Sequence, residues 1–92
     1  MKLEFSIETG KSVAETRAFI DTKILARPEA TMLLAEHRWE GNVLHASGSL
    51  GVGTITVEHG LVKVDIELSA FGAVAKTQIE RTLTEQFKRL SE

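Results

Sequence analysis

Three histidines are the residues of this sequence whose type best suits metal binding. His37, His45 and His59 could each offer an imidazole nitrogen, but such ligands must converge within about 2.1 Å of one ion. The alternation around them places His37 inward or toward the rim of a sheet, His45 outward and His59 in a distant turn. We therefore predict no metal site, and we expect these histidines to be hydrogen-bonded or solvated.

Ser49 invites comparison with the Gly-x-Ser-x-Gly element of hydrolases, because Gly51 follows two residues later. Ser47 occupies the place of the first glycine, and the element requires a strand-to-helix turn, whereas this segment joins two expected strands. The glycines here also lack the lysine and helix N-terminus of a phosphate-binding loop. We predict a hairpin with a bulge, with no nucleophile and no cofactor site.

Glu36 and His45, with Arg38 on the same face, form the best acid–base candidate. They face each other if Glu40-Gly41 is the turn of the hairpin. General acid–base catalysis is favoured by a concave, partly dry site that tunes pKa values, and this pair is expected on an open sheet face. A cross-strand ion pair worth at most ~1 kcal/mol is the stronger interpretation. We predict that the protein is not an enzyme.

The chain that positions these residues has 92 residues, no cysteine and a formal net charge of -2. This length suits a single domain, residues 1–92, that buries a little over ~60% of its unfolded surface. The absence of cysteine excludes disulfides and thiolate chemistry. Interspersed charges argue against nucleic-acid binding, and no apolar run approaches the roughly 20 residues of a membrane span. The expected location is the cytoplasm.

The first third of the chain predicts a strand followed by a helix. Residues Lys2 to Glu8 alternate between polar and apolar, as a half-buried strand does. Ser12 and Glu15 have the spacing of a capping box, so a helix is expected to begin at Val13. It is expected to end near residues 26–27, because Pro28 disfavours helical geometry at the preceding residue.

The rest of the chain predicts a meander of four strands and a closing helix. A two-residue His59-Gly60 turn pairs Val57 with Val62, so the apolar sides of the two strands coincide. After Phe71-Gly72 a long helix carries one apolar stripe: Ala75, Ile79, Leu83, Phe87 and Leu90. The expected fold is a β-α-β-β-β-β-α two-layer α+β sandwich, an antiparallel sheet with two helices on one face.

Three segments carry a resemblance to a known family: Arg38 to His45 (RWEGNVLH), Gly53 to Val57 (GTITV) and Val62 to Leu68 (VKVDIEL). They resemble the polyhydroxyalkanoic acid system proteins, with Pro28 and the glycine-rich residues 48–53 as departures from the pattern. The resemblance implies a small bacterial accessory or regulatory protein associated with polyhydroxyalkanoate storage granules or their proteins. It supplies no catalytic or ligand residue. The element order is also similar to half of a helix-grip lipid-binding domain.

We also expect a surface through which the protein could associate with storage granules or with their proteins. The candidate residues are Trp39, Leu50, Val52, Phe71 and Val74. Trp39 could instead anchor the core rim against a helix end, and the last two could plug the open end of the core. Alternative functions are a module that binds a small apolar ligand such as an acyl chain, and a homodimer formed through a strand edge or through Leu34, Val43 and Leu61. Lys2, Glu4 and Glu8 are charges of the kind that blunt an edge.

Overall fold

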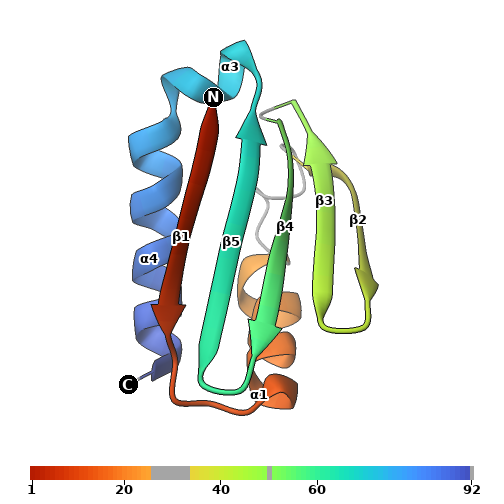
Figure 1. Cartoon of the computed structure of the whole chain (residues 1–92), viewed down its shortest axis with the longest axis vertical. Helices are drawn as coiled ribbons and strands as arrows, with labels where there is room; N and C mark the ends of the chain where they lie inside the picture. The colour runs from red at the N-terminus through yellow and green to blue at the C-terminus, as the bar shows by residue number, and fades with distance from the viewer. Residues whose placement is uncertain (26–33, 50, 92) are drawn as a thin grey trace.

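The structure is a computed structural model that describes residues 1–25, 34–49 and 51–91. Its elements are β1 (Lys2–Glu8), α1 (Val13–Phe19), the π-helix η1 (Ile20–Ile24), β2 (Leu34–Glu40), β3 (Val43–Gly48), β4 (Gly51–Glu58), β5 (Leu61–Leu68), α3 (Ala70–Val74) and α4 (Lys76–Ser91). The strands form one antiparallel sheet in the order β1-β5-β4-β3-β2 (Figure 1). The predicted α+β class is confirmed.

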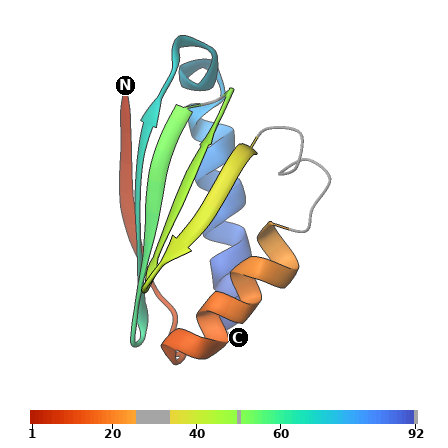
Figure 2. The ribbon, with the colours of Figure 1, turned by 90° about the vertical axis from the view of Figure 1, so that its right-hand side faces the viewer.

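The helices lie on one face of the sheet and leave the other face uncovered (Figure 2). Helix α4 contacts β1, and α1 contacts β4. The two helices meet through Phe19 and Phe87, whose ring centroids are 6.2 Å apart. The two-layer arrangement agrees with the burial of β1 and β5. Their outward side chains, apart from the half-buried Leu61, are exposed, and those facing the helices are buried or half-buried.

The last hairpin has the predicted register. Val57 pairs with Val62 and Ile55 with Val64, and Gly60 takes the positive φ of +77° that the turn requires. Val57, Val62 and Val64 are each at most 2% exposed. A slip of one residue would expose all of these side chains, and this penalty is what fixes the register.

The first hairpin differs from the prediction by two residues. Its turn is Gly41-Asn42, so Glu40 pairs with Val43. Gly41 has φ +61° at the first central position, which is where a type II′ turn requires a positive φ. His45 therefore lies opposite Arg38, and the predicted Glu36–His45 pair does not form. A shift of two residues keeps every side chain on its face, so burial could not discriminate between the two registers.

The glycine-rich segment also departs from the prediction. The β3–β4 register runs regularly from Val43–Thr56 to Gly48–Gly51, and the register shift lies instead in β2, between Leu34 and Glu36. Gly51, with φ +145°, is the one glycine of this segment that has a positive φ among those described. Gly53 serves another purpose, because a Cβ on it would lie 2.6 Å from the Asp65 carbonyl oxygen. Its role is to allow β4 and β5 to approach closely.

The first helix begins as predicted. The Ser12 hydroxyl accepts a hydrogen bond from the Glu15 N–H (3.2 Å) and donates one to the Glu15 carboxylate (3.3 Å). After Phe19 the helix widens into η1, whose π character is visible where the Leu25 N–H donates to the Ile20 carbonyl (2.8 Å). The predicted helix end and Pro28 lie outside the described residues.

The closing helix is divided. Residues 71–72 were predicted to end the sheet, but β5 ends at Leu68 and α3 begins directly after Ser69, whose hydroxyl accepts from the Gly72 N–H (3.1 Å). Ala75 leaves helical geometry with φ -100°, and α4 follows. The predicted stripe is confirmed in α4, where Phe87 is fully buried and Leu83 and Leu90 pack against the core.

Candidate functional site

Trp39 joins the sheet to the first helix. Its indole Nε1 donates to the Asp21 carboxylate at 2.9 Å, and the Arg17 guanidinium lies 4.5 Å from its ring centroid. Arg17 and Asp21 are four residues apart, so one side of the helix presents both to the indole. The ring itself is half-buried and packs against the core. This arrangement matches the anchoring role considered for Trp39 and separates it from the other candidate surface residues.

The large exposed apolar side chains lie at the other end of the sheet. Met1 (62% exposed), Val52 (55%) and Val74 (90%) are the large exposed hydrophobic residues that the described part of the chain contains. Met1 precedes β1, Val52 lies at the beginning of β4 opposite Glu67, and Val74 closes α3 just beyond β5 (Figure 1). We call these three side chains the sheet-end surface. Contiguous exposed apolar patches mark interaction sites, so this end of the sheet is the candidate interaction surface.

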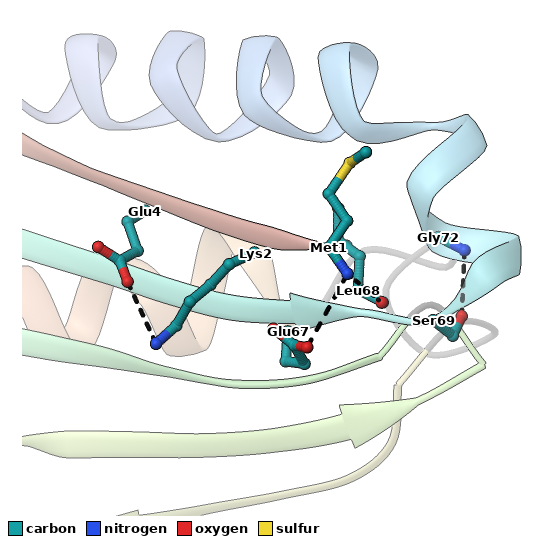
Figure 3. A network of polar contacts seen from close by, with 7 residues as sticks. All are labelled: Met1, Lys2, Glu4, Glu67, Leu68, Ser69 and Gly72. Carbon is teal, nitrogen blue, oxygen red and sulfur yellow. Dashed lines mark hydrogen bonds and ion pairs between the residues drawn. The ribbon is translucent and has the colours of Figure 1, made fainter.

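Ser69 connects two segments at this end of the fold through its hydroxyl group. Besides capping α3, its hydroxyl donates to the Ser49 carbonyl oxygen at 2.9 Å, which connects α3 to the turn between β3 and β4. Figure 3 shows the capping contact with the Gly72 N–H beside the end of β5. Ser49 therefore contributes its backbone to the structure, in a strand-to-strand connection as predicted.

Charged groups border the sheet-end surface. The amino group of Met1 lies 3.8 Å from the Glu67 carboxylate, and the Lys2 ammonium lies 3.2 Å from the Glu4 carboxylate (Figure 3). The Lys2 ammonium also lies 3.8 Å from the Asp65 carboxylate. The pKa of Lys2 is raised, first by its hydrogen bond to Glu4 and then by the negative charge of Asp65. These side chains are more than half exposed, so they contribute little to stability. They form a polar rim beside exposed apolar groups.

The other predicted residues are dispersed. His37 lies on β2, His45 on the opposite face of β3 and His59 in the β4–β5 turn. Within the described ranges, no group of three His, Asp or Glu side chains could hold a metal ion. Leu50 lies outside the described residues. Phe71 is part of α3, and its side chain lies outside them as well.

Sequence reasoning missed Met1, Arg17 and Asp21. The spacing of Arg17 and Asp21 was a usable signal, because positions four apart on a helix face the same neighbour. No sequence signal pointed to Met1. Its exposure follows from where β1 ends against β5, and the Leu68 N–H donates to the Met1 carbonyl there (2.7 Å).

A family model described as "Putative polyhydroxyalkanoic acid system protein" matches residues 3–90. The chain belongs to this family. The match covers the strands and helices described above and confirms the resemblance noted in the RWEGNVLH segment. No curated protein and no solved structure matched the chain. In the described part of this family member, no helix is both long enough and apolar enough to cross a membrane.

Proposed function

We propose that this protein is a non-enzymatic accessory or regulatory component of the polyhydroxyalkanoate storage system. It acts in the bacterial cytoplasm by associating, through the sheet-end surface, with the polyester granule or with proteins on it. Family membership supports the storage-polyester context. The observation that supports a binding role is that the large exposed apolar side chains, Met1, Val52 and Val74, lie at one end of the fold.

The chemistry of this end suits attachment to an apolar surface. Removing a valine or methionine side chain from water contributes about 1.5–3 kcal/mol, so a few such contacts give reversible binding once association costs are subtracted. The rim formed by Lys2 and Glu67 can remain in water, which is the arrangement of apolar centre and polar border found in protein interfaces.

An acyl-chain binder is less well supported by the packing of the interior. Ile20, Leu44 and Phe87 are each at most 1% exposed and belong to one cluster with Val57, Val62 and Val64. A ligand pocket of roughly 300 Å³ would displace several of these side chains from a domain this small.

Cosedimentation with polyester particles tests the proposal. Wild-type protein is expected in the pellet, and the double variant Val52→Glu/Val74→Glu is expected to remain in the supernatant. The matched control Ala14→Glu/Thr82→Glu adds the same charge at exposed positions elsewhere and is expected to behave as wild type.

A parallel arm replaces bare particles with particles carrying the granule polymerase. Binding to the coated particles alone would identify a granule protein as the partner. Wild-type protein in the supernatant in both arms, or equal pelleting of the two double variants, would contradict a role for the sheet-end surface.

A further inference from the structure

The two edges of the sheet differ in how they are protected. At the β1 edge, α4 contacts β1 and runs alongside it (Figure 1), whereas exposed charges occur on both edge strands. At the other edge, β2 pairs with β3 on one side, and none of the described strands pairs with its other side (Figure 1). An edge of this length presents backbone groups to which another strand can pair.

The backbone groups that β2 presents can be assigned. The Val57 N–H donates to the Asn42 carbonyl (2.8 Å), so Asn42 points its backbone toward β4. Hydrogen-bonding direction alternates along an antiparallel strand, so Val43 and His45 point theirs toward β2 and bond to Glu40 and Arg38. His37 and Trp39 therefore direct their N–H and C=O groups away from the sheet.

The exposed charges along β2 alternate in sign, so two antiparallel copies of this strand can place opposite charges across from each other. Glu36, Arg38 and Glu40 share the uncovered face and are exposed, with Arg38 74% and Glu40 69% exposed at the side chain. In an antiparallel pair of two β2 strands centred on His37, each Glu36 lies opposite Arg38 of the second copy. Centring on Arg38 instead places like charges opposite each other, which is unfavourable.

We propose that β2 pairs antiparallel with β2 of a second copy of this chain, with the two-fold axis at His37. This register pairs residues 36–38 of the two copies directly, on the regular side of the register shift between Leu34 and Glu36, and pairs the outward backbone groups of His37 with those of the second copy. Centring on Trp39 would also match charges, but it requires Gly41, which has φ +61° and cannot extend the strand. The two sheets then continue as one across the shared edge.

The contacts that β2 makes on the helix side of the sheet support a role for its outer edge in pairing. Trp39 is held from the inner side by Asp21 and Arg17, so the strand is fixed against α1 while its outer edge stays available. A contact made by one strand from each copy buries less than about 1,000 Å², the size of a weak or transient interface. The expected behaviour is therefore a concentration-dependent equilibrium between monomer and dimer.

Sedimentation equilibrium over a dilution series tests the pairing. Wild-type protein is expected to shift from monomer to dimer with rising concentration. Arg38→Glu turns both cross-copy attractions into repulsions and is expected to raise the dissociation constant on the order of tenfold or more. The matched control Arg81→Glu makes the same charge change on the exposed side of α4 and is expected to dimerise as wild type.

Two charge swaps determine the register. Glu36→Arg/Arg38→Glu restores opposite charges about His37 and is expected to recover the wild-type dissociation constant. Arg38→Glu/Glu40→Arg restores them about Trp39 instead and is expected to remain as weak as Arg38→Glu alone. His37→Pro removes an outward N–H that no strand of the monomer uses; it is expected to retain wild-type circular dichroism and to lose the dimer.

Three results would overturn the proposal. The first is wild-type protein that stays monomeric at every concentration. The second is a dimer that persists unchanged in both Arg38→Glu and His37→Pro. The third is recovery by the Trp39-centred swap and not by the His37-centred one. The proposal does not depend on the sheet-end surface, so failure of the particle-binding experiment leaves it unaffected.

Discussion

The two ends of the sheet's inner face are built on different principles. At the end near the Gly41 and Gly60 turns, one cross-strand row contributes a large side chain from every strand: Phe5, Val64, Ile55, Leu44 and Trp39. The next cross-strand row on the same face, toward the other end, consists of Leu3, Ile66, Gly53, Ala46 and His37. Large side chains give way to glycine and alanine on β4 and β3.

The two ends of the sheet therefore differ in the buried side chains they contribute and in the side chains they expose. Phe87 and Ile20 are fully buried and belong to one cluster with Leu44 and Val64 of the first row, whereas Leu3 and Leu68 are buried at the other end outside this cluster. At the glycine end β4 approaches β5 too closely for a Cβ, and the apolar side chains Val52 and Val74 are exposed. One end contains the main buried cluster, and the other end carries the exposed side chains of Val52 and Val74.

Phe87→Ala should produce the largest loss of stability. It removes a fully buried ring that contacts Phe19 and leaves a cavity among the strands, at a cost of about 3–5 kcal/mol in free energy of unfolding. Urea denaturation followed by circular dichroism measures it. Arg89→Ala, on the exposed side of the same helix, should stay within about 0.5 kcal/mol. Similar losses in the two variants would contradict the concentration of stability at this end.

Gly53→Ala should destabilise the pairing of β4 with β5 at the end of the sheet that contains Gly53. The added Cβ would lie 2.6 Å from the Asp65 carbonyl oxygen, so β4 and β5 must separate, at a cost of about 1–3 kcal/mol. Amide hydrogen exchange should accelerate along β5. Thr54→Ala changes the neighbouring residue on the uncovered face and serves as the control. An unperturbed Gly53→Ala protein would show that close strand approach is not what this end requires.

Trp39→Phe should have a moderate effect at the packed end. It keeps an aromatic ring but loses the hydrogen bond to Asp21, worth about 1 kcal/mol. A double-mutant cycle with Asp21→Ala, which leaves no side-chain acceptor, isolates that contact, and thermal unfolding provides the measurement. If the two substitutions are strictly additive, the indole and the carboxylate do not stabilise each other.

Lys2→Gln should have the smallest effect. The pKa of Lys2 is raised above 10.5 by Glu4 and Asp65, so its contribution is present below that pH and is lost as the pH rises through the higher value of the folded state. The side chain is exposed, so the difference from wild type should be slight at neutral pH and should vanish in strong alkali. A thermal midpoint for Lys2→Gln far below that of wild type at neutral pH would contradict this assignment.

The two hairpins show how far sequence reasoning reaches. The Val57–Val62 register was predictable, because alternating apolar residues on both sides of His59-Gly60 agree on one pairing. The first hairpin was placed two residues away, since Glu36, Arg38 and Glu40 remain on the same face in either register. The position of the left-handed glycine within the turn decided between them, and composition does not encode that choice.

The candidate surfaces were predictable only in part. Val52 and Val74 were named as candidates for an interaction surface, and both side chains are exposed. The alternative that Val74 plugs the open end of the core is wrong, because its side chain is 90% exposed. Trp39 was grouped with them, although it lies on the inner face of β2, against Arg17 and Asp21. Its placement depends on α1 crossing behind the sheet, a contact between residues far apart in the chain.

The amino-acid sequence by itself determined the order of the strands, the beginning of the first helix, the apolar stripe of the closing helix, the family and the face of each strand that is buried, because alternation, caps and turn residues act over a few neighbouring positions. Tertiary structure decided which end carries the exposed apolar groups, what Trp39 contacts and which edge of the sheet is open. These properties depend on the placement of α1 and α4 against the sheet, and burial of the whole apolar face, more than any local signal, sets that placement.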